Sequence, residues 1–555
     1  QCLGITDSQL KPNDLVHALL LAKVDLIWNG GIGTYVKATT ENNQDVGDRS
    51  NDPVRVNGKE LRCRVFGEGG NLGMTQKSRI EFALNGGACN TDFIDNSAGV
   101  DCSDHEVNIK ILLNERVRQG ELTIEQRNQL LEVMTDNVAQ LVLHNNYRQT
   151  QAISLACYRC HQDFSEYWRF ILERESAGQL NRELEALPDD EILAERKKLS
   201  LGLTRPELSV LLSYGKMLLK EEVLSSNIPE DQYVAKAIMG AFPNQLLEQY
   251  PRKIEHHSLR REIITNQIVN EIINLMGLTY CQRQMESTGA TMAEVVRAYV
   301  VVRDVLRLDR VWAQVEALDY KVPSEVQFEL FQALMRLGRR ASRWILRNRR
   351  SCLNPEQEVQ AFGPKLVELQ LLLPTLFSRQ ESSGWMEEVD RIVALGVQQN
   401  IAVLVATSNF LYFGFGIADI AVSSGKPVGL VLELYYRMSA ALDLDWFADQ
   451  IVNLEPTTRW EDFARESYVD DLESQRRSLT SSLLSSVKSV KDIDGVMDVW
   501  KAAQAPLITR WIDMTAELHA APKGDFAMFS VALRELLDLV QSTEIRPDNP
   551  PVCLV

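Results

Sequence analysis

The chain has 555 residues, of which 45% are hydrophobic and 24% are charged. This composition is typical of a globular protein, and the length is sufficient for three or four domains of roughly 150 residues each. The net charge of −17 argues against a general binder of nucleic acid or anionic membranes, because an acidic surface repels phosphate groups.

The nine cysteines are irregularly spaced, which argues against a disulfide framework and indicates reduced thiols. No apolar run reaches the length of about eighteen residues that a transmembrane helix needs. The first residues also lack the basic and apolar segments of a secretion signal. We therefore expect a cytoplasmic protein that binds neither membranes nor nucleic acid. The chain begins with Gln1, so it is either processed or a fragment.

Short apolar runs alternate with glycine-rich turns in roughly the first 114 residues. Three runs of five residues resemble strands, and each is followed by a turn cluster: residues 24–28 (VDLIW), 62–66 (RCRVF) and 91–95 (TDFID). Strands that end in glycine loops and are separated by helical stretches are typical of a parallel α/β sheet. Ligands bind at the carboxyl ends of such strands.

From about residue 104 onward, the apolar spacing becomes helical. Thr204-Arg205-Pro206-Glu207 is a capping box with proline just inside the helix start. Amphipathic patterns continue to about residue 541, so we predict that the last four-fifths of the chain is mostly α-helical. No fixed-period repeat is visible, which disfavours a solenoid.

A glycine turn follows the second predicted strand and contains Gly67, Gly69, Gly70 and Gly73. Glycines there allow positive φ angles and the close approach of a cofactor to the main chain. Asn71 adds an amide that both donates and accepts hydrogen bonds. The spacing is not the dinucleotide fingerprint, because Leu72 stands where the third glycine belongs. An ordinary tight turn is the alternative.

Three motifs in this region together resemble the NAD-dependent glutamate dehydrogenases. EGGN at residues 68–71 is similar to a loop of that family that reaches the cofactor. NSAGV at residues 96–100 resembles its NAGGV turn, and Ser103 and Glu106 match the following S-x-x-E. The order and the offset of seven residues between Asn96 and Ser103 agree with the family. The resemblance is strongest to the large-subunit bacterial class and covers nearly the whole chain.

The resemblance assigns roles to individual residues. It implies that Asn71 contacts the nicotinamide-side ribose of NAD, that Asn96 lies beside nicotinamide and substrate, and that Ser103 binds the side-chain carboxylate of glutamate. The loop that begins at Asn29 would cover the nicotinamide end of the cofactor. The expected cofactor-binding residues are Asn29, Gly30, Gly69, Gly70, Asn71 and Asn96, with Ser103 as the substrate contact, no metal ligand and no catalytic residue.

The motifs depart from the family pattern at several positions. Gly70 stands for the usual alanine, Gly73-Met74 for proline-threonine and Cys102 for valine. Ser103-Asp104-His105-Glu106 is also a capping box before an apolar run, so without the family Ser103 is more simply a helix N-cap. The two roles are compatible, because a helix N-terminus attracts carboxylates.

A glutamate dehydrogenase also needs a lysine of lowered pKa and an aspartate for proton transfer. The family carries these in glycine-rich motifs of an earlier domain, and we find no such motif here. We therefore expect the C-terminal portion of a longer enzyme that converts L-glutamate to 2-oxoglutarate and ammonia with NAD, inactive alone and homo-oligomeric at full length. The resemblance does not identify effectors or distinguish NAD from NADP.

The expected fold is α/β plus all-α, a partial Rossmann-like (doubly wound) dinucleotide-binding domain followed by a large helical domain. Residues 1–115 would complete the catalytic NAD-binding domain, residues 116–190 would form a helical connection that packs back on it, and residues 191–555 would form the helical C-terminal domain. A non-catalytic scaffold, oligomerisation or regulatory module is the alternative function.

Two other patterns are weaker. Cys157-Tyr158-Arg159-Cys160-His161 matches a haem-attachment motif, but it falls in a helical pattern and the chain shows no export signal. An arginine cluster at residues 336–350 is better explained as a helix face paired with acidic neighbours or another subunit than as a nucleic-acid site.

Overall fold

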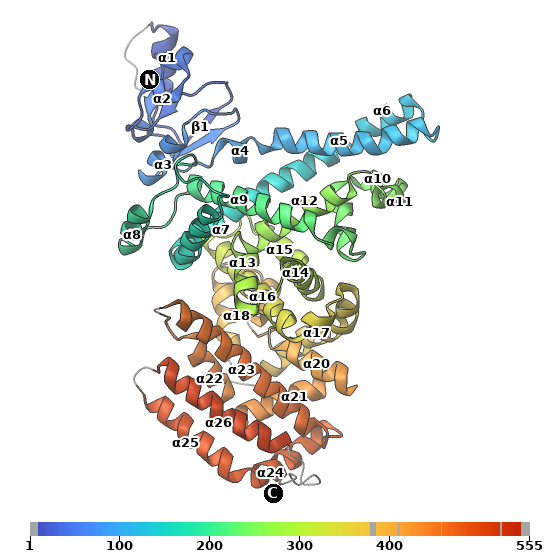
Figure 1. The fold of residues 1–555 in the computed structure, drawn as a ribbon. Helices are drawn as coiled ribbons and strands as arrows, with labels where there is room; N and C mark the ends of the chain where they lie inside the picture. Colours follow the sequence, from blue (N-terminus) through green and yellow to red (C-terminus); the bar gives the residue numbers. More distant parts are fainter. Residues whose placement is uncertain (1–8, 378–383, 409, 457, 522–523, 545–555) are drawn as a thin grey trace. The chain divides into compact units, whose positions relative to one another are not determined.

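The computed structural model describes residues 9–377, 384–408, 410–456, 458–521 and 524–544 (Figure 1). The chain divides into two compact units. The N-terminal unit comprises Gln1–Arg283 and Thr291–Val296, and the C-terminal unit comprises Gln284–Ala290 and Arg297–Val555. No helix of the described residues is long and apolar enough to cross a membrane.

The strands of the N-terminal unit form two small parallel sheets. Strand β1 (Leu26–Asn29) pairs with β4 (Val65–Glu68), and β2 (Val36–Lys37) pairs with β3 (Val56–Asn57). Helices account for 74% of the structure and strands for 3%. The predicted Rossmann-like, doubly wound domain is therefore wrong, because that fold needs a row of parallel strands joined by crossover helices.

The third predicted strand, residues 91–95, also does not form. Thr91 is extended and buried, and the residues after it form the helix α4 (Asp92–Asp95). A run of five residues is too short for its apolar pattern to distinguish a strand from a helical turn. Asp92 and Asp95 lie in the first turn, where negative charge is favourable. The helix is consistent with that preference.

A small apolar core joins the two sheets to helix α3 (Gln76–Leu84), and it includes Val36, Phe66, Met74 and Phe82. Shorter elements surround it: α1 (Pro12–Leu20), α2 (Asn43–Val46), η1 (Arg49–Asn51) and η2 (Gly58–Glu60).

The remainder of the N-terminal unit is helical. Helix α5 (Ser97–Arg118) leads away from the strands, and after α6 (Ile124–Val133) the long helix α7 (Thr135–Ser176) returns beside it (Figure 1). The predicted capping box is confirmed at the start of α9 (Arg205–Ser225), where Thr204 and Glu207 bond reciprocally. The unit also contains α8 (Asp190–Lys198), η3 (Ile228–Glu230), η4 (Val234–Ala241), α10 (Asn244–Gln249), α11 (Pro251–Glu255) and α12 (Arg260–Met276).

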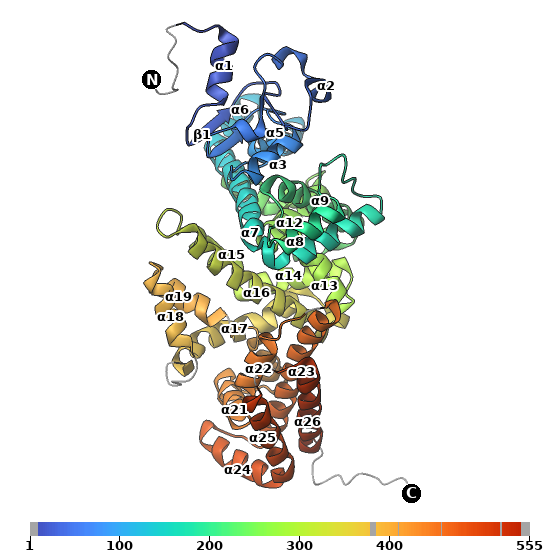
Figure 2. The ribbon, with the colours of Figure 1, turned by 90° about the vertical axis from the view of Figure 1, so that its left-hand side faces the viewer.

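The C-terminal unit is built from packed helices around an apolar and aromatic core. In Figure 2, α23 (Arg459–Leu484) and α26 (Phe526–Glu544) lie side by side. Its other elements are α15 (Leu308–Glu316), α16 (Ser324–Asn348), η5 (Arg350–Cys352), α17 (Pro355–Phe377), α18 (Trp385–Ala394), α19 (Gln399–Ser408), α20 (Gly414–Ser424), α21 (Val428–Ala441), α22 (Leu444–Val452), η6 (Val490–Asp492), α24 (Ile493–Ala503) and α25 (Ala505–Ala520). Helices α13 (Tyr280–Thr288) and α14 (Met292–Leu306) carry residues of both units.

Arginines of the predicted basic cluster are paired with acidic side chains of the same unit. Arg343 contacts Glu466 at 2.6 Å and Asp470 at 2.7 Å, and Arg349 contacts Glu358 at 3.2 Å. For these arginines, the ion pairs confirm the expected pairing with acidic neighbours.

Candidate functional site

The turn after β4 packs against the end of β1, and its glycines make this packing possible. Trp28 lies opposite Gly67 across the sheet. A Cβ atom on Gly67 would lie 2.5 Å from the indole Cε3 of Trp28, and one on Gly69 would lie 2.7 Å from its Nε1. Real side chains do not approach so closely, so Gly67 and Gly69 make room for the Trp28 ring.

Gly70 and Gly73 of the same turn face the residues that follow Trp28. A Cβ on Gly70 would lie 2.5 Å from the carbonyl oxygen of Gly31, and one on Gly73 would overlap the amide nitrogen of Asn29. The positive φ in this turn belongs to Leu72, at 58°. The glycines are therefore explained by contact between two loops of the chain, rather than by the positive φ angles that the sequence suggested.

Buried carboxylates fix the turn. Glu68, at the end of β4, is fully buried and binds Arg79 through two contacts of 2.7 and 2.9 Å. The same carboxylate accepts the backbone N–H of Met74 at 2.9 Å, and Asp92 accepts that of Leu72 at 2.8 Å. Burial raises the pKa of Glu68, although Arg79 opposes the shift. The turn is thus bonded at Leu72 and Met74 to buried side chains.

Helix α4 is attached to the same strand end. Asp95 accepts the backbone N–H of Glu68 at 3.0 Å and the side-chain amide of Asn90 at 2.8 Å. Arg205, the first residue of α9, donates to Asn90 at 3.1 Å. Burial raises the pKa of Asp95. These bonds bring the start of α5 close to the turn after β4.

Asn71 and Asn96 meet as a result. The side-chain Nδ2 of Asn96 donates to Oδ1 of Asn71, and this pair is open to solvent. Asn146 of α7 supports the same corner by donating to the carbonyl of Ile94 at 2.9 Å and to the hydroxyl of Ser97 at 2.8 Å. Two asparagines that are 25 residues apart in the sequence therefore form one exposed group of donors and acceptors.

Ser103 lies inside α5 and is not its N-cap. The helix begins at Ser97, and the Ser103 hydroxyl donates to the carbonyl of Gly99 at 3.2 Å. The capping-box interpretation of Ser103 is wrong, because the helix starts nearly two turns earlier. Seven residues correspond to about two helical turns. Ser103 and Asn96 consequently lie on one side of α5, and Ser103 is exposed.

The remaining predicted cofactor residues are Asn29, the last residue of β1, and Gly30, the first residue of the loop that follows. The Asn29 side chain turns inward: its Oδ1 accepts the N–H of Gly31 at 3.2 Å, and its Nδ2 is buried against Gly73. Gly30 is exposed, and a Cβ there would have no neighbour within 4 Å. Asn29 therefore holds the loop, while Asn71, Asn96 and Ser103 offer side chains to solvent.

Helix α5 is braced on the side opposite Ser103. The buried His105 donates through Nδ1 to the carbonyl of Ala241 at 2.9 Å. His257 donates through Nε2 to the carbonyl of Asn108 at 3.0 Å and accepts the N–H of Leu259 at Nδ1. Burial lowers the pKa of His257, which favours the neutral ring that this bonding requires.

One lysine of unusual acidity also lies behind α5. Burial lowers the pKa of Lys216 to about 7, and its Nζ donates to Gln149 of α7 at 2.8 Å. The negative charge of Asp101 on α5 opposes this shift of the Lys216 pKa. Asp101 and Ser103 are two positions apart, which places them on opposite sides of a helix. Lys216 therefore does not face the exposed site.

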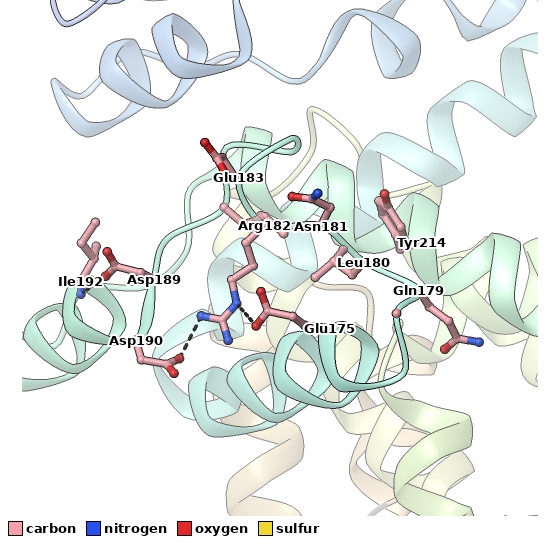
Figure 3. Close-up of a pocket in the computed structure, with 12 residues that line it drawn as sticks. Glu175, Gln179, Leu180, Asn181, Arg182, Glu183, Asp189, Asp190, Ile192 and Tyr214 are labelled. Atoms are coloured by element: carbon pink, nitrogen blue, oxygen red, sulfur yellow. Dashed lines mark hydrogen bonds and ion pairs between the residues drawn. The ribbon is translucent and has the colours of Figure 1, made fainter.

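A cavity of about 970 Å³ lies at the other end of α7 (Figure 3). Arg182 lies between Glu175 and Asp190, at 2.8 and 2.9 Å. At 1.5 Å per residue, Glu175 is roughly 40 Å along the helix from Asn146. The lining is mainly polar and acidic, and the one arginine is already neutralised. This hollow is separate from the Asn71–Asn96 site.

The C-x-x-C-H pattern lies within helix α7. Cys160 Sγ accepts the backbone N–H of Leu203 at 2.9 Å. Burial raises the pKa of Cys157 to about 11 and that of Cys160 to about 12, so both thiols stay protonated. In the part of the chain that the structure describes, no group of three His, Cys, Asp or Glu residues is arranged to hold a metal ion.

Sequence comparisons agree with the motifs of this site. Residues 1–156 match the family described as bacterial NAD-glutamate dehydrogenase, catalytic domain, and residues 200–538 match glutamate dehydrogenase, C-terminal. The chain belongs to the bacterial NAD-glutamate dehydrogenase family.

Three relatives carry the name NAD-specific glutamate dehydrogenase. The protein from Pseudomonas aeruginosa is 48% identical over 540 residues, that from Halomonas elongata 44% over 539, and that from Mycobacterium tuberculosis 35% over 536. Each alignment covers 97% of this chain and 33% of the relative. The chain thus spans about a third of the length of the relatives that it matches.

Proposed function

We propose that this chain is part of an NAD-dependent glutamate dehydrogenase and supplies one portion of its cofactor and substrate site. The reaction is the oxidative deamination of L-glutamate to 2-oxoglutarate and ammonia. The observation that carries the proposal is the exposed pair of Asn71 and Asn96, with Ser103 two turns along the same side of α5. The names of the relatives support the assignment of cofactor and substrate.

The two amides suit a ribose and a carboxamide. Each amide has both donors and acceptors, and the bond between Asn96 and Asn71 leaves the Asn71 Nδ2 and the Asn96 Oδ1 free for further bonds. NAD, when bound, accepts the hydride. Asn71 would bond the nicotinamide-side ribose, and Asn96 would bond the nicotinamide carboxamide and orient its ring toward the substrate.

Ser103 can bind a carboxylate after one small change. Its hydroxyl proton now points to the carbonyl of Gly99. That carbonyl is also the partner of the Ser103 backbone N–H in a regular helix, so it stays bonded when the hydroxyl rotates away. A hydrogen bond to a charged group contributes about 1.5–3 kcal/mol. We assign Ser103 to the side-chain carboxylate of glutamate.

We assign the proton-transfer lysine and aspartate of the reaction to the part of the relatives' length that this chain does not cover. The first 115 residues would then supply the site, with the later helices holding it in position. The complete enzyme is proposed to be a cytoplasmic homo-oligomer.

A second role, as a structural module, rests on the bracing of α5. The buried bonds from His105 and His257 tie α5 to η4 and to the residues after α11. A buried hydrogen bond that loses one partner costs about 1–3 kcal/mol. We propose that this helical region fixes the direction in which α5 presents Ser103, without touching the substrate itself.

The test of the substrate role is the substitution Ser103→Ala in the full-length enzyme. We expect the KM for glutamate to rise about tenfold or more, because one hydrogen bond to a charged group is lost. The KM for NAD should change little.

Ser176→Ala is the matched control. Ser176 is exposed at the end of α7, and its hydroxyl makes the same kind of bond, to the carbonyl of Leu172 at 2.8 Å. It is remote from α5, so its loss should leave both KM values unchanged. An unchanged KM for glutamate in the Ser103 variant would remove Ser103 from the substrate site.

A further inference from the structure

Trp28 is a large aromatic side chain that the protein leaves open to solvent at the candidate site. It is 59% exposed and is the third of the four residues of β1, directly before Asn29 at the end of the strand. The carboxyl ends of β1 and β4 meet here, because the two strands are parallel and in register. Ligands of parallel sheets bind at such ends.

The ring of Trp28 is held on one face only. Gly67 and Gly69 lie directly against it, close enough that a methyl group on either would overlap the indole. The two glycines have no side chains, so the ring packs directly on their backbone. More than half of Trp28 is nevertheless exposed, so the opposite face of the ring is open. A flat, supported and open aromatic face is suited to stack on a second flat ring.

The surroundings favour a positively charged ring over an aliphatic ligand. Glu68, the next residue after Gly67, forms an ion pair with Arg79. The positive charge of Arg79 is therefore balanced and does not repel a cationic ligand. Tryptophan is the strongest of the aromatic residues in attracting cations to its face. Asn71, the proposed ribose contact, is two residues beyond Gly69.

We propose that Trp28 is a cofactor-positioning residue whose indole stacks on the nicotinamide ring of NAD and binds its oxidised, pyridinium form more tightly than its reduced form. This inference rests on the proposed function, because it takes the site at Asn71 and Asn96 to be the NAD site. In this proposal, Gly67 and Gly69 support the indole ring from below its open face.

The experiment measures the dissociation constants of NAD and NADH for the full-length enzyme by calorimetry, with Trp28→Leu and Trp28→Phe. Loss of a cation–π contact should weaken NAD binding by about 5- to 20-fold in Trp28→Leu. NADH binding should weaken less, because its dihydronicotinamide ring is uncharged. Trp28→Phe keeps a smaller aromatic face and should lie between Trp28→Leu and the unaltered enzyme.

Trp460→Leu is the control, since Trp460 is a 79% exposed tryptophan on α23 of the C-terminal unit. It should leave both constants unchanged. Energy transfer from tryptophan to bound NADH gives a second readout. When tryptophan is excited, the NADH emission should be weaker in Trp28→Phe than in the unaltered enzyme. It should be unchanged in Trp460→Phe.

The outcomes separate the two proposals. If the unaltered enzyme binds NAD and both Trp28 variants bind it equally well, the stacking role is overturned and the proposed function stands. Equal weakening of NAD and NADH would overturn the preference for the charged ring. If the unaltered enzyme binds neither nucleotide, the proposed function fails and the role of Trp28 fails with it.

Discussion

Replacing Arg79 by methionine tests how the turn after β4 is held. The substitution keeps most of the side-chain volume but removes the charge that neutralises Glu68. The side chain of Arg79 is 5% exposed and that of Glu68 is fully buried. Removing one partner of a buried ion pair costs about 3–5 kcal/mol, because the remaining carboxylate has neither water nor a counter-charge.

The cost should appear as faster local opening of the turn. The backbone N–H of Met74 donates to Glu68, so its hydrogen exchange reports directly on this contact. At about 1.4 kcal/mol per factor of ten, 3 kcal/mol corresponds to exchange roughly a hundred times faster in Arg79→Met. Lowering the pH should shrink the difference from the unaltered protein, because the uncompensated Glu68 carboxylate then takes up a proton.

Two controls identify the cause. Arg64→Met removes the same kind of charge from an ion pair with Asp25, whose side chains are 83% and 91% exposed, and surface pairs contribute little. Exchange at Met74 should stay within about a factor of two of the unaltered protein. Adding Glu68→Gln to Arg79→Met should slow exchange again, because the uncompensated charge at position 68 is then removed. Equal effects of Arg79→Met and Arg64→Met would refute the reasoning.

Three further predictions concern single positions. Gly70→Ala should destabilise the N-terminal unit by about 1–3 kcal/mol through overlap with a backbone carbonyl, whereas Gly30→Ala, with open space around it, should be neutral in thermal unfolding. Asn71→Ala and Asn96→Ala should each raise the KM for NAD in the full-length enzyme about tenfold, and the double variant should fall short of the product of the two effects, because the residues share a bond. Burial raises the pKa of Glu473 to about 7, so its contribution to stability is complete below its ordinary pKa of 4.5 and is lost as the pH rises through about 7. Glu473→Gln should therefore flatten the pH dependence of C-terminal-unit unfolding between about pH 4.5 and 7.

Local signals in the sequence predicted local structure well. The capping box at Thr204 begins a helix as expected, because its two bonds lie within four residues of one another. The glycine turn also follows a strand as predicted. Neither statement depends on what another part of the chain does.

Features that depend on distant contacts were not predictable. The number of strands beside β4 is decided by pairing, and residues 91–95 formed a helix because a short apolar run suits either structure. Ser103-x-x-Glu106 resembles a helix start, yet the helix begins at Ser97, since the same residues also suit the middle of a helix. Trp28 could have been noticed as an aromatic residue directly before a glycine loop, but its contact with Gly67 and Gly69 depends on the register of β1 with β4.

The most direct test of the proposed site is a structure of the full-length enzyme with NADH and 2-oxoglutarate bound. We predict a nicotinamide-side ribose bonded to Asn71, a carboxamide beside Asn96 and a substrate carboxylate within hydrogen-bond distance of the Ser103 hydroxyl. A cofactor bound elsewhere, with this side of α5 covered by protein, would contradict the account.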